Sequence, residues 1–442
     1  MSDYMFMLES HLSTDQNRVV AEVVAAAGQA GVNLFLAGGA MRDILGGFPV
    51  RDLDFTVEGN ALKLAKTLAL KPHVRIVSED EERKCAELIF PGQVTAQIAM
   101  ARQERCGKPG ARPHVRPASI YDDLRGRDFT VNAIALSLNP ASRGLLLDPT
   151  NGLADLERKE LRAVHNYVFY DDPVRILRLV RFRVRFGFTV EERTQQQYQN
   201  AREAGVEASI PARSLHDELF HMADETNSAD IVRAFEQEKL LTLFSPSLEG
   251  AKLNLQGLAK LQKARQMIPF GADLRLDTRG LFLTVLTEKL SPKEFAALIK
   301  TAALRKSEVD LWQKLPQRAK ALERELKSSR LKKASQIYTA LQKAPGDQVL
   351  YLLLYSPHRL VQDRIRNYLQ KYLPAAMEIT DREVAAAGSA PGAADFAKAK
   401  QEMILARLDG RLKKAPPPEP APELPAAPPP GPYRSRTKPA AR

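Results

Sequence analysis

The sequence predicts an α+β fold, in which an N-terminal mixed sheet flanked by helices is followed by domains built only of helices. Three observations lead to this prediction. Short apolar runs typical of strands alternate with helical patterns through the first 140 residues. Beyond about residue 150 the strand signals disappear and long helical patterns follow. A chain of 442 residues also exceeds one ordinary core, so two or three domains are expected.

The elements of the N-terminal part follow one another in a regular order. Valines at helical spacing predict a first helix over residues 17–29, and a second helix over residues 61–69 ends before Pro72. Short apolar or alternating runs predict five strands, at residues 34–37, 52–57, 74–77, 85–90 and 95–99. In the C-terminal half, helical spacing predicts helices over residues 229–243, 307–326 and 334–343.

These patterns divide the chain into four parts. A sheet-containing head spans residues 1–140, a helical neck 141–225, and a helical body and tail 226–414. Residues 415–442 hold 11 of the 29 prolines. A segment of this composition cannot bury an apolar face, so we expect it to be disordered.

The overall composition narrows the class of protein. Hydrophobic content of 44% and charged content of 27% are typical of a soluble globular protein. No apolar run approaches a membrane span, and the acidic N-terminus lacks the pattern of a signal peptide. Two cysteines cannot form a disulfide framework, so we expect a cytoplasmic protein. The net charge of +12 favours an acidic partner such as RNA, although it is equally compatible with solubility alone.

Two aspartates separated by one residue follow a glycine pair. Asp52 and Asp54 lie two apart on a predicted strand, so their side chains point to the same face. Neighbouring carboxylates repel each other unless a cation lies between them, and magnesium (Mg2+) prefers such oxygen ligands. Gly38 and Gly39 stand between a strand and a helix, where backbone amides can approach a triphosphate, and Arg42 follows one turn later. The combination predicts a site that binds Mg2+ and a nucleoside triphosphate.

This arrangement resembles the first motif of a known family, the class II tRNA nucleotidyltransferases and bacterial poly(A) polymerases of the polymerase β superfamily. The matching positions are Gly38, Gly39, Arg42, Asp43, Gly46, Asp52 and Asp54. The resemblance covers roughly residues 30 to 220 and implies a nucleotidyl-transfer head, with Asp52 and Asp54 as the catalytic, metal-binding acids.

A second segment combines hydrogen-bond donors and acceptors suited to a ribose. Arg127, Asp128 and Asn132 can together meet a 2′-hydroxyl. The segment resembles the family's second motif, which implies ribose binding and a preference for ribonucleotides. Gly126 stands where the family usually has another arginine, so a paired-arginine contact is not expected.

One acid of the superfamily pattern is missing. Members often carry a third carboxylate on a neighbouring strand, but this sequence has Gln97 at the matching point. Glu87 on the preceding strand or Asp128 supplies the third acid, or two acids suffice.

The segment that begins at Asp171 points to base recognition. Pro173 suits the first helical position with Asp172 as N-cap, and Arg175 and Arg178 share a helix face. Cytosine and adenine both present an amine beside a ring-nitrogen acceptor, whereas uracil and guanine reverse this polarity. The segment resembles the family motif whose Asp and Arg act as an amino-acid template, at Asp172 and Arg175. Asp171 replaces the usual Glu.

Three further segments resemble the family. Residues 102–117 form a loop at the position of the flexible loop that helps to switch base choice from C to A. Residues 148–156 resemble the hinge-like connector between head and neck, and residues 209–219 resemble the motif that supports the neck.

The resemblance implies that the 3′-hydroxyl of a tRNA acceptor end attacks the α-phosphate of CTP or ATP. Addition of the whole CCA end is the first reading, and specialised CC-adding or A-adding enzymes are close alternatives. Poly(A) synthesis is disfavoured because residues 78–84 are acidic where bacterial poly(A) polymerases are basic. A catalytically silent RNA-binding protein, or transfer to a small molecule or protein, are alternatives of other classes.

Overall fold

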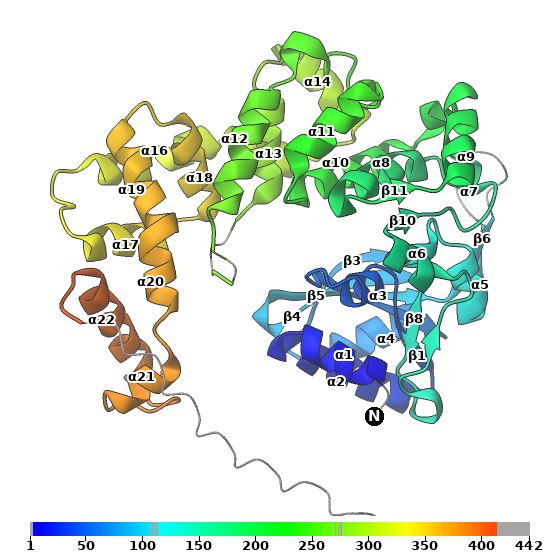
Figure 1. Cartoon of the computed structure of the whole chain (residues 1–442), viewed down its shortest axis with the longest axis horizontal. Coiled ribbons are helices and arrows are strands. Elements are labelled where there is room, and N and C mark those ends of the chain that lie inside the picture. Colours follow the sequence, from blue (N-terminus) through cyan, green and yellow to red (C-terminus); the bar gives the residue numbers. More distant parts are fainter. Residues whose placement is uncertain are drawn as a thin grey trace, which may run out of the picture.

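The computed structural model describes residues 3–105, 107, 110, 114–269, 271, 272, 274 and 276–412. A mixed sheet with its helices forms the N-terminal part, and the remainder is almost entirely helical (Figure 1). The predicted α+β class is therefore confirmed. The Pro-rich residues 415–442 lie outside the described residues. Within the described part, no helix is long and apolar enough to cross a membrane.

The N-terminal sheet has seven strands in the order β3-β4-β5-β2-β1-β8-β9. Strands β2 and β5 pair in parallel, and the other neighbours are antiparallel. Their bounds are β1 Asn33–Ala37, β2 Asp52–Glu58, β3 Arg75–Asp80, β4 Cys85–Phe90, β5 Val94–Met100, β8 Ala135–Ser137 and β9 Leu146–Leu147. Strand β2 thus lies between β1 and β5, inside the sheet rather than at its edge.

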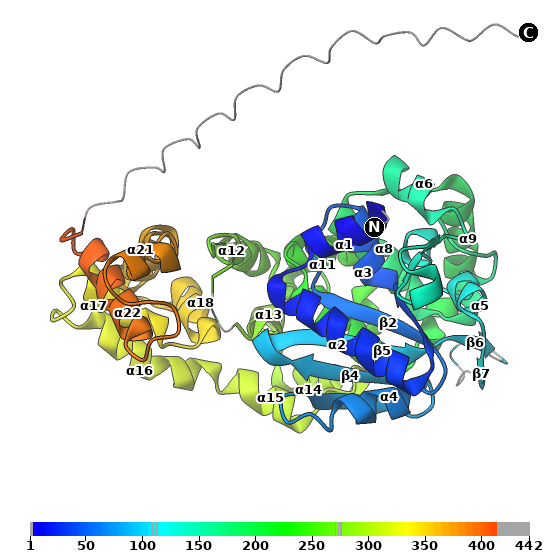
Figure 2. The same cartoon turned by 90° about the horizontal axis from the view of Figure 1, so that it is seen from below.

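Helices α2 (Thr14–Ala30) and α4 (Ala61–Leu68) lie along the sheet (Figure 2). Helix α2 starts with a capping box, in which Ser13 accepts from the Gln16 amide and Gln16 accepts from the Ser13 amide. It ends at Gly31, whose φ of 64° only glycine adopts without strain. The apolar faces of both helices pack into a core with the strand residues Leu36, Leu53, Phe55 and Ile98. The opposite face of β2 and β5 is left for the polar residues described below.

The helical part continues from α6 to α22. Figure 1 shows these helices as an arc that begins above the sheet and ends far from it. The bounds are α6 Gly152–Arg158, α7 Val168–Asp171, α8 Val174–Phe186, α9 Glu192–Glu203, α10 Ala212–Asp224, α11 Ser228–Gln237, α12 Leu255–Gln266, α13 Thr278–Leu286, α14 Pro292–Thr301, α15 Lys306–Gln313, α16 Leu315–Lys327, α17 Ala334–Gln342, α18 Gly346–Tyr355, α19 Arg359–Asn367, α20 Leu373–Met377, α21 Asp381–Ala386 and α22 Phe396–Leu408. The remaining α-helices are α1 Asp3–His11, α3 Gly38–Leu45 and α5 Ile120–Arg125. One hydrophobic cluster runs through the helical part, separate from the core under the sheet.

Some expected elements are wrong in detail. The helix expected over residues 307–326 is two helices, α15 and α16, because Pro316 lacks an amide hydrogen and starts a new helix. The helix expected over 229–243 ends at Gln237, near Lys239 with its left-handed φ of 57°. Strands also continue beyond residue 150, as the pair β10 (Glu160–Leu161) and β11 (Thr189–Val190). Two-residue strands are too short to give a periodic signal.

Residues 102–117 include a hairpin of two strands, β6 (Arg102–Arg105) and β7 (His114–Pro117). The expectation of a loop over the whole of residues 102–117 was therefore wrong at both ends, where residues 102–105 and 114–117 form paired strands.

Candidate active site

Asp52 and Asp54 lie at the start of β2, on one face of the sheet. Asp52 is exposed and Asp54 is half-buried. In the parallel register with β5, Asp52 aligns with Thr95 and Asp54 aligns with Gln97. The Thr95 hydroxyl donates a hydrogen bond to the Asp52 carboxylate. No local sequence pattern indicates a role for Thr95, because the contact depends on the register between two strands far apart in the chain.

The glycine turn between β1 and α3 (Gly38–Leu45) rests directly against Asp54. The Ala40 amide donates to Asp54 Oδ2 at 3.2 Å. A Cβ on Gly39 would lie 2.9 Å from that same oxygen, and a Cβ on Gly38 would lie 2.5 Å from Arg127 Nη1. Gly38 also has a φ of 65°. The two glycines therefore let a carboxylate and a guanidinium approach the turn.

Electrostatics at Asp54 fit a bound cation. Burial and the neighbouring Asp52 charge raise the pKa of Asp54 to about 6, although Arg127 and Arg42 oppose the shift. Two carboxylates on one face, one of them poorly solvated, are an unfavourable arrangement that a divalent ion would relieve. The donor set of hard oxygens matches what Mg2+ prefers.

Neither candidate for the third acid joins this pair. Glu87 on β4 aligns with Gln97 on β5, and Gln97 aligns with Asp54 on β2, so strand β5 lies between Glu87 and Asp54. Asp128 is buried and its carboxylate accepts hydrogen bonds from Asn132, from the Phe129 amide and from Arg178. Among the described residues, no group of three or more potential protein ligands of the types His, Cys, Asp or Glu is assembled. The site has two carboxylates, with Gln97 beside them.

Arg42 is buried beneath the glycine turn rather than exposed to solvent. Its Nη1 donates to Asn132 Oδ1 at 2.7 Å, and its Nε donates to Asp43 Oδ1 at 2.8 Å. The guanidinium carbon lies 4.6 Å from the centre of the Phe186 ring. The positive charge of Arg42 is therefore fixed next to Gly39 by both polar and aromatic contacts.

Arg127, expected at the ribose, is held by the head itself. Its Nη2 donates to Thr56 Oγ1 at 3.1 Å and to Asp123 Oδ2 at 2.9 Å, and its Nη1 donates to the Asn132 carbonyl at 3.2 Å. Asn132 in turn donates from Nδ2 to Asp128 Oδ1 at 2.9 Å. The three residues expected at the ribose thus belong to one network that also includes Arg42.

Asp128 links this network to the neck helix α8. Arg178 on α8 pairs with Asp128 Oδ2 at 2.6 Å through Nη2 and at 2.8 Å through Nε. Burial alone would raise the pKa of Asp128, but the charges of Arg178 and Arg175 hold it below its ordinary value. Asp128 is therefore a buried anion, and Arg178 is its partner on the neck.

Asp172 and Arg175 lie at the start of α8. Helix α8 begins at Val174, and the short helix α7 ends at Asp171. Pro173 already has helical dihedral angles, whereas Asp172 is extended and its carbonyl accepts from the Arg175 amide at 3.0 Å, so Asp172 directly precedes the first helical residue, as expected. Arg175 Nη2 donates to the Gly126 carbonyl at 2.9 Å, and its Nε lies 4.0 Å from Asp172 Oδ2. The Asp172 side chain is about one third exposed.

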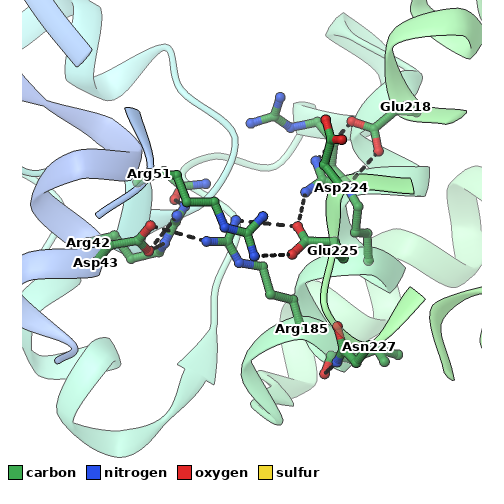
Figure 3. A network of polar contacts seen from close by, with 12 residues as sticks. Arg42, Asp43, Arg51, Arg185, Glu218, Asp224, Glu225 and Asn227 are labelled. Carbon is green, nitrogen blue, oxygen red and sulfur yellow. Dashed lines mark hydrogen bonds and ion pairs between the residues drawn. The ribbon is translucent and has the colours of Figure 1, made fainter. Parts of the chain in front are cut away.

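A second set of ion pairs joins the head to the neck (Figure 3). Arg185 on α8 pairs with Asp43 at 3.1 Å and with Glu225 at 3.4 Å, and Arg51 pairs with Glu225 at 2.9 Å. Glu225 follows α10 and is buried. It was not expected from the sequence, because a single acid between two helices gives no local signal.

Comparisons with known proteins agree with this architecture. A profile of the poly A polymerase head domain matches residues 34–162. An A-adding tRNA nucleotidyltransferase of Aquifex aeolicus is 32% identical over 341 residues, which cover 76% of this chain and 40% of the relative. A CC-adding tRNA nucleotidyltransferase of Deinococcus radiodurans is 39% identical over 152 residues, which cover 34% of this chain and 40% of the relative.

The chain spans less than half the length of these curated relatives. A solved structure described as a tRNA-processing enzyme in an apo form matches 90% of this chain and 99% of its own length, with a TM-score of 0.52 and 27% sequence identity. The match therefore includes the helical part as well as the sheet. Residues 34–162 therefore match the poly A polymerase head domain, and most of the chain is similar to tRNA nucleotidyltransferases.

Proposed function

We propose that this protein is an enzyme that adds nucleotides to the 3′ end of tRNA without a nucleic-acid template. The observation that carries the proposal is the continuous network between two sites. The carboxylate pair on β2 rests on the glycine turn, Arg42 beneath that turn binds Asn132, and Asn132 binds Asp128. Asp128 then binds Arg178, one turn after the base-reading candidates on α8. A triphosphate at β2 and a base at α8 would thus belong to the same nucleotide.

In this proposal the expected residues divide the work of binding the nucleotide, and Arg178, expected to read the base, would instead hold Asp128. Asp52 and Asp54 would hold Mg2+, which supplies Lewis-acid stabilisation of the transferred phosphoryl group. Gly38 and Gly39 would lie against the triphosphate, with the fixed charge of Arg42 beneath them. Asp128 and Asn132 would orient the ribose, and Arg127 would support the turn. Asp172 and Arg175 would accept from the base amine and donate to its ring nitrogen.

The nucleotide added is a finer part of the proposal. The similarity to the A-adding enzyme covers 76% of this chain, including much of the helical part, whereas that to the CC-adding enzyme covers 34%. This difference supports terminal A addition as a specialised activity. Addition of the whole CCA end, which is our first interpretation of the sequence, requires the enzyme to use CTP as well as ATP.

A tRNA extension assay separates these activities. Purified protein is given Mg2+ and tRNA that lacks the CCA end, tRNA that lacks only the terminal A, or complete tRNA, with CTP and ATP offered separately and together. Use of ATP alone, on the tRNA that lacks the terminal A, indicates A addition. Use of CTP and then ATP indicates CCA addition, CTP alone indicates CC addition, and an unlimited A tail indicates poly(A) synthesis. No incorporation on any acceptor contradicts the proposed function and favours an RNA-binding protein without activity.

The wider setting remains our proposal as well. We infer a cytoplasmic protein, a head at residues 1–140, a neck at 141–225 and an RNA-binding body and tail at 226–414. Proteolysis that releases fragments ending near residues 140 and 225 would support this division, and release at other positions would contradict it.

A further inference from the structure

We propose that Arg51 and Glu225 are positioning residues that set the separation between the carboxylate pair on β2 and the base-reading end of α8. The inference rests on the proposed function, since it assigns the pair a part in nucleotide selection. Glu225 lies outside the segment that resembles the family motifs, and Arg51 received no role from the sequence.

Glu225 is a fixed point in the neck. Its main-chain carbonyl accepts from Arg265 Nη1 of α12 at 2.8 Å, which closes the C-terminal end of α10. Its buried carboxylate accepts from Arg181 at 3.3 Å and from Arg185 at 3.4 Å, both on α8. Main chain and side chain are both anchored, so a residue that pairs with Glu225 is tied to three helices, α8, α10 and α12.

Arg51 connects this fixed point to the catalytic strand. It directly precedes Asp52, the first residue of β2, and its Nη2 donates to Glu225 Oε2 at 2.9 Å. Arg51 itself is about one third exposed, and an ion pair between two mobile exposed side chains would restrain little. Here the acid is buried and immobile, and therefore the pair fixes where the start of β2 lies relative to the neck.

A second connection crosses the same boundary. Arg185 bonds Glu225 and also Asp43 Oδ2 at 3.1 Å, while Asp43 Oδ1 accepts from Arg42. Glu225 thus reaches the head directly through Arg51 and indirectly through Arg185 and Asp43 (Figure 3). Arg185 lies near the end of α8, and Arg175 lies at its start. Because α8 is one continuous helix, holding its far end to the head also orients the end that carries Arg175.

The consequence concerns selection rather than chemistry. A bound nucleotide would extend from its phosphates at β2 to its base at α8. The correct base is recognised only if the distance between β2 and α8 matches the length of the nucleotide. Loss of the Arg51–Glu225 pair lets β2 and α8 drift apart. The correct nucleotide then loses transition-state contacts, and incorrect ones lose less.

Distance between head and neck gives a test that does not depend on activity. Spin labels are placed at Lys63→Cys on α4 and Gln199→Cys on α9, both exposed, in a background with Cys85→Ser and Cys106→Ser. We expect a broader distance distribution in Arg51→Met and in Glu225→Gln than in the parent. Arg51→Lys retains the charge and should restore the narrow distribution. Unchanged distributions in both Arg51→Met and Glu225→Gln would overturn the proposal.

Nucleotide selectivity gives the second readout. We expect the ratio of kcat/KM for the preferred nucleotide to that for GTP to fall about tenfold in Arg51→Met, with partial recovery in Arg51→Lys. A ratio does not depend on the fraction of active protein, so partial unfolding leaves it unchanged. Arg233→Met is a matched control, because it removes an exposed ion pair within α11 and should change neither readout.

The outcomes separate the two proposals. A broader distribution with an unchanged ratio, or a changed ratio with an unchanged distribution, would overturn the positioning role. If the parent incorporates no nucleotide, the proposed function fails, and the labels alone then decide whether the pair holds head and neck together.

Discussion

The carboxylate of Asp54 lies between the negative charge of Asp52 and the main chain of the glycine turn. Its pKa of about 6 in the folded chain exceeds the ordinary value of 3.8. Between these values the folded state binds more protons than the unfolded state, so stability is greatest below about pH 4 and falls as the pH rises through about 6. In the absence of metal, the ionised site costs stability at neutral pH.

Asp54→Asn should therefore stabilise the metal-free protein above pH 6. We expect a gain of about 1 to 2 kcal/mol at pH 8, discounted for the partial exposure of the side chain, and little change at pH 4. Urea unfolding in the presence of a chelator measures the difference. Equal stability of the two proteins at pH 8 would show that Asp54 is not strained, and Mg2+ should narrow the difference by stabilising only the parent.

Activity should depend on the pair and not on Glu87. Asp52→Ala and Asp54→Ala each remove a proposed metal ligand, and we expect incorporation to fall by about 1000-fold or more, which corresponds to several kcal/mol of transition-state stabilisation. Glu87→Gln is the matched control, because β5 separates Glu87 from the pair. Incorporation that survives in Asp52→Ala or disappears in Glu87→Gln would contradict the metal assignment.

At the level of single residues, the sequence predicts contacts between neighbours in the chain but not contacts between distant segments. The aspartates and glycines were located in advance because a strand, a turn and a helix place neighbours in the chain close together in space. Thr95, Arg51 and Glu225 were missed because their contacts depend on strand register and on helix packing across more than 40 residues. Arg42 was expected at the triphosphate, yet its side chain is only 5% exposed, because Asp43 and the Phe186 ring hold it beneath the glycine turn.

At the scale of single elements, the turn between β1 and α3 contains Gly38, which has left-handed backbone angles and lies close to the side chain of Arg127. Gly38→Ala should lose about 1 kcal/mol of stability from the φ of 65°, and it should also displace Arg127. Gly31→Ala at the end of α2 has nearly the same φ, 64°, but nothing lies within 4 Å of the added Cβ.

The two alanine variants therefore form a matched pair. Both should unfold at lower urea concentration, and only Gly38→Ala should lose nucleotide incorporation. If Gly31→Ala loses as much activity, the effect comes from stability rather than from the turn.

Helices and strands were predicted well where the apolar pattern was long and its ends were marked by capping or turn residues. Helix α2 and strands β2, β4 and β5 lie within a few residues of the expected ranges. Pro316 was a visible stop signal inside the expected helix 307–326, and reading it would have divided α15 from α16. By contrast, β10 and β11 pair two residues each from segments nearly 30 residues apart, and no local pattern encodes such a contact.

On the scale of the whole molecule, separate hydrophobic clusters lie under the sheet and through the helices. The sequence contains one tryptophan, Trp312, and it is buried in the helical cluster. Its fluorescence therefore reports the helical part, whereas far-ultraviolet circular dichroism reports both parts.

Leu36→Ala should destabilise the head by about 2 to 5 kcal/mol, because Leu36 is fully buried in the core under the sheet. We expect the circular dichroism transition in urea to shift to lower concentration while the main tryptophan transition stays in place. Leu350→Ala, fully buried in the helical cluster, is the converse control and should shift the fluorescence. Equal shifts of both signals in both variants would show that the molecule unfolds as one cooperative unit.

The place of β2 inside the sheet has a consequence for synthesis on the ribosome. Strand β2 pairs with β1, which precedes it in the chain, and with β5, which ends only at Met100. Strand β1 pairs in turn with β8, which is translated later still, at residues 135–137. A nascent chain that has exposed Asp52 and Asp54 but not these later strands cannot complete the sheet around them. The relative positions of the two carboxylates are then not fixed, so the pair would bind a divalent ion only weakly. Ion binding at the proposed site would therefore begin only after the strands up to β8 have been translated, because an unfinished chain lacks the completed sheet.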